Sequence, residues 1–138
     1  LPLFPKEFFE KLAESPFGKF FLIRYNGAIS GGSVCLELKN RRLYEFFVCG
    51  TDRKLRNVFP STLATWAAIE YAAKNGFSYF DMMGAGKPND EYGVREFKAK
   101  FGGNLVDYGR FSYICNPILF AIGKLGLSLI RQINFLKI

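Results

Sequence analysis

The sequence predicts an α/β domain of the α+β class, in which helices flank a mixed, mostly antiparallel sheet, followed by a helical C-terminal tail. Three strand-like apolar runs follow one another through tight turns, the first of which is Asn26-Gly27. A helix with a broad apolar face comes next, and a further apolar run follows it. Hydrophobic residues make up 49% of the 138 residues, which is typical of a chain with a packed core.

The N-terminal part is predicted to hold one short helix and three antiparallel strands. The helix begins near Phe4, places Phe8, Phe9 and Leu12 on one face, and ends at Ser15-Pro16-Phe17-Gly18. Paired glycines in the second strand indicate a bulge or a close backbone approach. The strands are predicted over residues 20–25, 28–38 and 43–49, the glycines are Gly31 and Gly32, and the second turn is Lys39-Asn40-Arg41-Arg42.

The central part is predicted to continue with a long helix, a buried strand, a second helix and a last strand. The long helix runs from Pro60 to Asn75, and its apolar residues are expected to face the core. These residues are Leu63, Trp66, Ala67, Ile69 and Ala73. The other elements are a strand over 77–83, a loop over 84–89, a helix over 94–101 that ends at Gly102-Gly103, and a strand over 104–113.

Residues 1–113 are expected to form this domain, and residues 114–138 an apolar, basic helical tail. From Pro117 onward the tail contains Lys124, Arg131 and Lys137 but no acidic residue. The cations within the apolar segment argue against a bilayer span. Two alternatives remain: a helix packed on this domain or on a missing partner domain, and an interfacial helix with its cations near lipid headgroups.

Composition limits the chemistry and the partners. The chain has no histidine, which excludes a Ser-His-Asp or Cys-His nucleophile and an imidazole-bound zinc within it. Its formal net charge is +7, which favours polyanionic partners such as nucleic acid, phosphorylated ligands or an anionic membrane. Cys35, Cys49 and Cys115 lie in apolar runs and are predicted to be reduced core thiols of a cytosolic protein. The Leu1-Pro2 start suggests a fragment of a longer protein.

Three groups of residues are candidates for a functional site. Asp81 ends the predicted buried strand, where a carboxylate either points into a cleft or caps the following loop. A basic loop before the long helix could bind phosphate, because cations and helix-terminal N–H groups both favour anions; it could equally be a solvated loop. The helix over 94–101 is either a cationic site or an amphipathic surface helix. The cations are Arg53, Lys54 and Arg56 in the loop, and Arg95, Lys98 and Lys100 in the helix.

Two sequence runs carry a resemblance to a known family. The order of predicted elements is similar to that of GNAT acyltransferases. The run YFDMMGAG, paired with GVREFKAKFGGNLVDYGRF, closely resembles the second GNAT-like domain of the FemAB family of peptidoglycan-bridge aminoacyltransferases. The resemblance covers Phe4 to Phe111, and its most specific part is Phe97 to Gly103. The tail lies outside it.

The resemblance implies transfer of an amino acid from aminoacyl-tRNA to an amine of a peptidoglycan precursor, either nucleotide-linked or lipid-linked. It also implies a missing N-terminal GNAT-like domain, so that the isolated chain would be inactive. Phe97 and Lys98 match the family's Phe-Lys pair near the acceptor site, and Asp81 matches the aspartate that ends its central strand. The cations Arg95, Arg53, Lys54 and Arg56 would bind substrate phosphates.

Elementary chemistry agrees with these roles. Attack of an amine on an aminoacyl ester builds negative charge on the carbonyl oxygen, and the Lys98 ammonium could stabilise that charge. Candidates for the base are Asp81, a substrate carboxylate and the departing ribose oxygen.

No cofactor is expected, because the segment Gly50 to Asn57 has one glycine where CoA-dependent GNAT enzymes carry a Gln/Arg-x-x-Gly-x-Gly/Ala loop. The alternatives are an acyltransferase with another acyl donor, such as acyl-CoA, and a non-catalytic binding half of a two-domain protein. The expected location is the cytoplasm, with peripheral membrane contact through residues 117–138.

Overall fold

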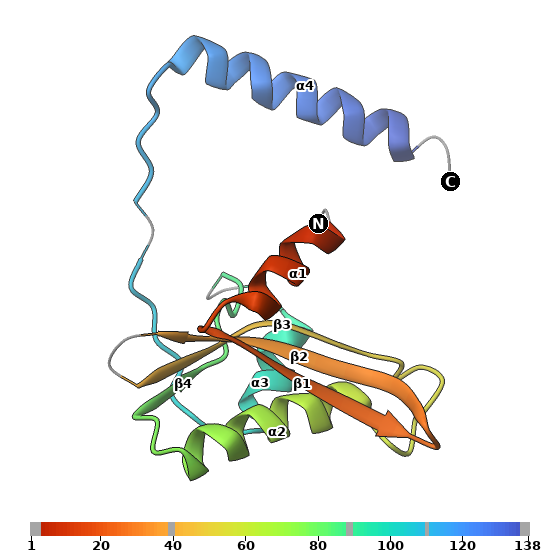
Figure 1. The fold of residues 1–138 in the computed structure, drawn as a ribbon. Helices are drawn as coiled ribbons and strands as arrows, with labels where there is room; N and C mark the ends of the chain where they lie inside the picture. The colour runs from red at the N-terminus through yellow and green to blue at the C-terminus, as the bar shows by residue number, and fades with distance from the viewer. Residues whose placement is uncertain (1–3, 39–40, 88–89, 110, 136–138) are drawn as a thin grey trace. The chain divides into compact units, whose positions relative to one another are not determined.

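The computed structural model describes residues 4–38, 41–87, 90–109 and 111–135. These residues belong to two compact units, residues 1–105 and 106–138. The first unit holds a four-stranded sheet and three helices, and the second holds one helix (Figure 1).

The sheet is mixed and mostly antiparallel, as predicted. Its strands lie in the order β1-β2-β3-β4, with antiparallel pairs β1–β2 and β2–β3 and the parallel pair β3–β4. The Asn26-Gly27 turn joins the first two strands, and both residues have positive φ angles. The strand bounds are Gly18–Tyr25 for β1, Ala28–Leu38 for β2, Arg42–Gly50 for β3 and Tyr79–Asp81 for β4. Part of the second predicted turn, Lys39-Asn40, lies outside the described residues.

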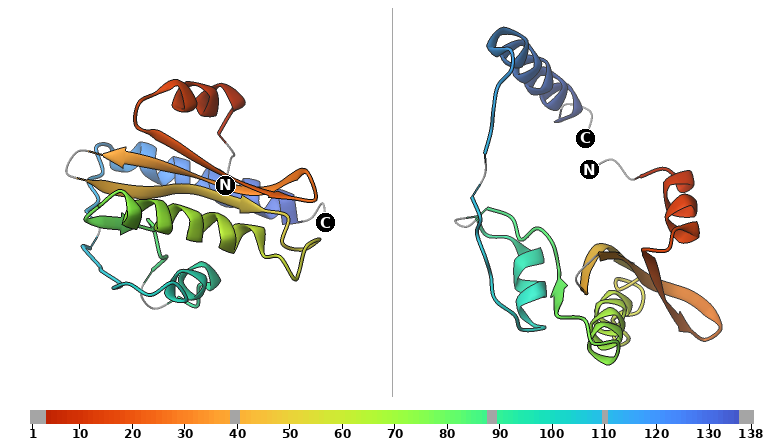
Figure 2. Two further views of the ribbon diagram at one scale, coloured as in Figure 1. Left: turned by 60° about the horizontal axis from the view of Figure 1, so that its bottom comes forward. Right: turned by 60° about the vertical axis from the view of Figure 1, so that its left-hand side comes forward.

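Helices cover both faces of the sheet (Figure 2). On one face, α1 (Lys6–Glu14) packs Phe8 and Phe9 against Phe46 and Phe47 of β3, with ring centroids 5.7 Å apart in each pair. On the other face, α2 (Pro60–Lys74) packs over β2 and β3. The core under α2 centres on Cys35, Leu43, Ala68 and Ala72. The helix α3 (Gly93–Ala99) follows β4, and Gly102 and Gly103 come after it with positive φ angles.

The buried face of α2 differs from the predicted one. Leu63 and Trp66 are 42% and 55% exposed, whereas the buried residues of the helix are small. The buried residues of α2 are Pro60, Ala64, Thr65, Ala68 and Ala72. Small side chains let the helix backbone lie close to the sheet, and the large apolar side chains therefore lie at its flanks and outer side.

The paired glycines of β2 allow two close backbone approaches, as expected. A Cβ atom on Gly31 would lie 2.8 Å from Pro60 Cβ and 2.9 Å from the Cys49 oxygen. On Gly32 it would lie 2.6 Å from the Phe21 oxygen. The expected bulge lies next to them, because Ile23 pairs with Gly31 and Arg24 with Ile29, which leaves Ser30 without a partner on β1.

The structure differs from the prediction for two strands and for two of the three cysteines. The strand after α2 is only Tyr79–Asp81 and is not fully buried, because it pairs with β3 alone at the edge of the sheet. Residues 104–109 and 111–113 contain no strand: Asp107 accepts a hydrogen bond from Gly109 N at 2.9 Å, and this turn, with φ of 73° at Gly109, interrupts the extended run. Cys35 is buried, but Cys49 and Cys115 are exposed, because they lie at a strand end and in a loop.

The second unit contains the predicted tail helix, α4 (Pro117–Phe135). Asn116 caps its start, because Asn116 Oδ1 accepts hydrogen bonds from Ile118 N and Leu119 N, both at 3.1 Å. No helix among the described residues is long and apolar enough to cross a membrane.

Candidate active site

Lys98 of α3 lies at the centre of the candidate site. Its ammonium donates hydrogen bonds to two backbone carbonyls that follow β4, those of Met82 and Gly84, the latter at 2.8 Å. The side chain is half-buried, and burial lowers the pKa of Lys98, while the carboxylates of Glu45 and Asp81 raise it. A cation is therefore held in a fixed position beside the end of β4.

Arg95, one turn before Lys98 on α3, holds the same loop. Its Nε atom donates to the Ala85 oxygen at 2.9 Å, and the guanidinium also donates to the Lys87 oxygen. The two cations of α3 thus fix the loop that follows β4 through its backbone. The predicted role of Arg95 in binding substrate phosphate stays a prediction.

Asp81 and Phe97 flank this centre. Asp81 ends β4, and its Oδ1 atom accepts a hydrogen bond from Met83 N at 2.6 Å, which matches the loop-capping alternative. Asp81 also contributes to the charge around Lys98. Phe97 packs against Phe101 with ring centroids 5.2 Å apart. The structure therefore brings Lys98 and Asp81 together, and Phe97 lies next to Lys98 on α3.

Glu45 is a buried carboxylate that the sequence reasoning missed. It lies on β3, is 4% exposed, and accepts a hydrogen bond from Thr65 Oγ1 of α2 at 2.7 Å. Burial raises the pKa of Glu45, whereas the Thr65 hydrogen bond and the Lys98 charge lower it. The sequence offered one signal, which is that Glu45 is the single acid within the apolar run Leu43 to Cys49. An acid buried within such a strand needs a partner and is therefore a candidate for a functional role.

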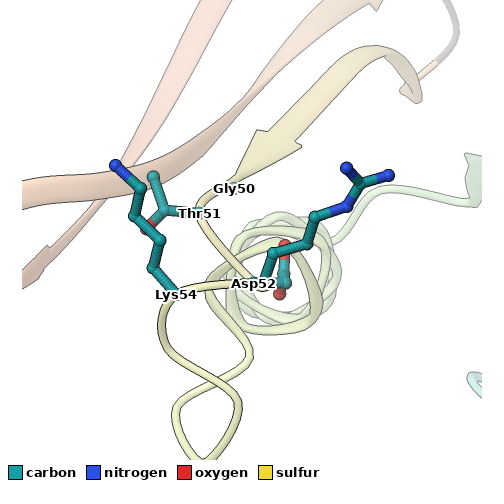
Figure 3. A pocket seen from close by; sticks show the side chains of 5 residues that line it. Gly50, Thr51, Asp52 and Lys54 are labelled. Carbon is teal, nitrogen blue, oxygen red and sulfur yellow. The ribbon is translucent and has the colours of Figure 1, made fainter.

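The basic loop lies elsewhere, between β3 and α2. Arg53 and Lys54 line a hollow of about 390 Å³ together with Gly50, Thr51 and Asp52 (Figure 3). Arg56 lies on the same loop but does not line the hollow. Gly50 is five residues beyond Glu45 on β3, a rise of about 17 Å along a strand. The predicted site residues therefore form two groups, one around Lys98 and one at the start of α2.

The start of α2 is occupied by a carboxylate of the chain itself. Asp52 Oδ1 accepts a hydrogen bond from Ser61 N at 3.2 Å, and Figure 3 shows the Asp52 side chain over the end of the helix. Pro60, the first residue of α2, has no N–H group to offer. Gly50 permits the approach, because a Cβ atom there would lie 2.6 Å from both Asp52 Oδ2 and Ser61 N.

The sequence matches the FemAB family over residues 27–125. The chain belongs to the FemAB family. The match includes the strand, loop and helix that hold Asp81, Phe97 and Lys98. No curated protein matches the chain.

Solved acetyltransferases share the fold of this FemAB domain. An aminoglycoside acetyltransferase from an uncultured soil metagenomic sample, in complex with sisomicin, matches with a TM-score of 0.61 and 14% identity over 84% of this chain and 78% of that one. The ribosomal-protein-alanine N-acetyltransferase of Brucella melitensis matches with a TM-score of 0.59 and 12% identity over 78% and 76%. AAC(6')-Iy, in complex with a CoA bisubstrate analogue, matches with a TM-score of 0.59 and 9% identity over 83% of this chain and 84% of that one. The GNAT-like fold is confirmed.

Family and fold together support an N-acyltransferase. The fold family also implies CoA, whose pyrophosphate would need the start of the long helix. The start of the helix does not offer its Ser61 N–H to a pyrophosphate, because Asp52 already accepts it. The predicted binding of substrate phosphate by Arg53 and Lys54 in the same hollow stays a prediction. The single glycine of this loop, Gly50, is used for the approach of Asp52.

Proposed function

We propose that this chain is the C-terminal GNAT-like half of a FemAB transferase that moves an aminoacyl group from aminoacyl-tRNA to an amine of a peptidoglycan precursor. The observation that carries the proposal is the half-buried Lys98 ammonium, fixed by the carbonyls of Met82 and Gly84 on the stretch that matches the family. The Asp52 carboxylate at the start of α2 supports a donor other than CoA.

In the proposed reaction the acceptor nitrogen forms a bond to the ester carbonyl carbon of the aminoacyl group. The bond from that carbon to the tRNA ribose oxygen breaks, and the proton lost by the amine ends on that oxygen. Lys98 stabilises the negative charge that develops on the carbonyl oxygen, a contribution typically worth about 10²–10³ in rate. A substrate carboxylate or the departing ribose oxygen accepts the proton first, since Asp81 already caps the loop after β4.

Single-turnover transfer from aminoacyl-tRNA by the full-length protein tests the role of Lys98. We expect Lys98→Ala to lower the rate by about 10²–10³ while the protein stays folded, as judged by circular dichroism. The matched control is Lys100→Ala, because Lys100 is an exposed cation two residues further along the chain. Wild-type transfer by Lys98→Ala would exclude the catalytic role and leave the binding-half alternative.

A second variant separates the effect of the Lys98 charge from the effect of holding the loop after β4. Arg95→Ala removes the other cation that holds the loop after β4 but leaves the Lys98 ammonium in place. At saturating substrate, where a loss of phosphate binding by Arg95 does not limit the rate, we expect Arg95→Ala to retain most of the transfer rate. A loss as large as that of Lys98→Ala would mean that both residues act only by holding the loop.

We also propose that α4 lies at an anionic lipid surface, as a lipid-linked acceptor would require. Ile118, Ile122, Leu125 and Leu129 share one face of α4 at helical spacing and are 59–72% exposed. Lys124 and Ser128 lie on another face, and residues 117–138 contain no acid. An apolar face on a helix that carries Lys124 and no acid is complementary to anionic headgroups.

Co-sedimentation with vesicles tests this surface. We expect the chain to bind phosphatidylcholine vesicles that contain phosphatidylglycerol, and to bind pure phosphatidylcholine vesicles weakly. The double substitution Leu125→Ser, Leu129→Ser should abolish binding, whereas Leu63→Ser on α2, at an exposed leucine outside α4, should not. Self-association of the chain without vesicle binding would overturn the proposal in favour of a protein contact.

A further inference from the structure

Glu45 lies where three strands and a helix meet. It pairs with Cys35 of β2, and Thr65 of α2 donates a hydrogen bond to its carboxylate at 2.7 Å. Cys35 and Thr65 are fully buried, and Glu45 is 4% exposed. A carboxylate with so little access to water depends on nearby donors and cations to remain charged.

The register of the parallel pair brings Glu45 close to the residues that hold Lys98. Tyr44 of β3 pairs with Asp81 of β4, so the next residues along the two strands are Glu45 and Met82. The Met82 oxygen accepts a hydrogen bond from Lys98 Nζ. The Lys98 ammonium is therefore held beside the buried carboxylate, with the exposed Asp81 carboxylate as a second neighbour.

We infer that Glu45 is a positioning residue that keeps the Lys98 ammonium charged at the reacting centre. The inference deepens the proposed function and rests on it for its catalytic meaning. The opposite charges support each other: Glu45 raises the pKa of Lys98, and Lys98 lowers the pKa of Glu45. Asp81 is exposed, and water screens its charge more strongly.

The other described groups that interact with Glu45 carry no positive charge. Burial raises the pKa of Cys35 to about 12, so its thiol is neutral across the physiological range. Thr65 donates a hydrogen bond but carries no charge. Among the described groups that interact with Glu45, Lys98 of α3 is the cation.

Titration of Lys98 by NMR, with the lysine side chains labelled at the ε position, tests the inference without any assay of activity. We expect Glu45→Gln, which keeps an oxygen to accept from Thr65, to lower the midpoint of Lys98 relative to wild type. Asp81→Asn is the matched control, because it removes the other carboxylate, and its effect should be smaller. An unchanged midpoint in Glu45→Gln would overturn the inference.

The reciprocal titration covers the case in which Glu45→Gln does not fold. In Lys98→Met, the midpoint of the Glu45 carboxyl should rise, because the charge that lowers it is gone. An unchanged Glu45 midpoint would overturn the inference. Midpoints that move as expected, together with full transfer by Lys98→Ala, would retain the charge pair and refute the catalytic role of Lys98.

In the transfer assay, the role of Glu45 predicts a change in the pH profile. The alkaline limb should move to lower pH in Glu45→Gln, because Lys98 loses its proton earlier. A uniformly lower rate with an unmoved profile would indicate a merely structural role.

Discussion

Thr65 Oγ1 of α2 lies 2.7 Å from Glu45 Oε1 of β3, and both side chains are buried. This hydrogen bond joins α2 to the sheet in the same layer as the hydrophobic core. It also explains why the inner face of α2 carries a threonine beside its alanines.

Replacement of Thr65 by valine should lower the free energy of unfolding by about 1–3 kcal/mol, because it leaves a buried carboxylate oxygen without its donor. The pKa of Glu45 should rise in the same variant, since the Thr65 hydrogen bond lowers it. Urea unfolding and the pH dependence of stability measure both effects. The control is Thr62→Val, a partly exposed threonine on the same helix. Equal losses in the two variants would contradict the prediction.

Replacement of Asp52 by alanine should lower the free energy of unfolding by about 0.5–2 kcal/mol, because the Ser61 N–H at the start of α2 loses its acceptor. Thermal unfolding measures the loss, and Asp90→Ala, at an exposed aspartate, should leave stability unchanged.

Acetyl-CoA should not bind the wild-type chain in calorimetric titration, because the Asp52 carboxylate is already placed at the start of α2. Tight, stoichiometric binding would contradict this prediction and favour an acyl-CoA donor.

Replacement of Gly31 by alanine should destabilise the domain by about 1–3 kcal/mol, since the added methyl group would overlap Pro60 and the Cys49 carbonyl. Gly84→Ala is the matched control, because a Cβ atom at Gly84 has no neighbour within 4 Å. Chemical denaturation of both variants tests the close contact between β2 and the start of α2; equal stability would refute it.

The three thiols should differ in reactivity. Iodoacetamide should modify Cys49 and Cys115, which are exposed, and leave Cys35 unmodified, because Cys35 is buried and its pKa is raised to about 12. Mass spectrometry of the folded chain should therefore show two modified sites, and urea should expose the third. Modification of Cys35 at the rate of the other two would contradict the packing of β2 under α2.

Local signals in the sequence predicted the strands and helices better than the packing between them. Asn26-Gly27 fixed a hairpin, and Gly102-Gly103 marked the end of a helix, because each signal depends on backbone conformation at its own position. The inner face of α2 could not be read in the same way. Alanines form this face because the helix lies close to the sheet, and that distance depends on residues elsewhere, such as Gly31.

In the candidate site, too, the sequence predicted local features but not the packing between elements. The resemblance located Lys98 and Asp81, and the structure brings both to the end of β4. Glu45 was missed because its burial depends on the pairing of β3 with two strands from different parts of the chain. The predicted strand over 104–113 failed because apolar alternation does not produce a strand where a turn at Asp107 interrupts it.

One irregularity of β3 affects how Glu45 is found in related sequences. Val34 pairs with Phe47 and Cys35 with Glu45, so Phe46 is an extra residue without a partner on β2. A relative that lacks this residue can keep the same strand pairing with a chain one residue shorter. An alignment without a gap at Phe46 would then compare Glu45 with the wrong position in that relative. The buried carboxylate should therefore be sought by strand register rather than by column identity.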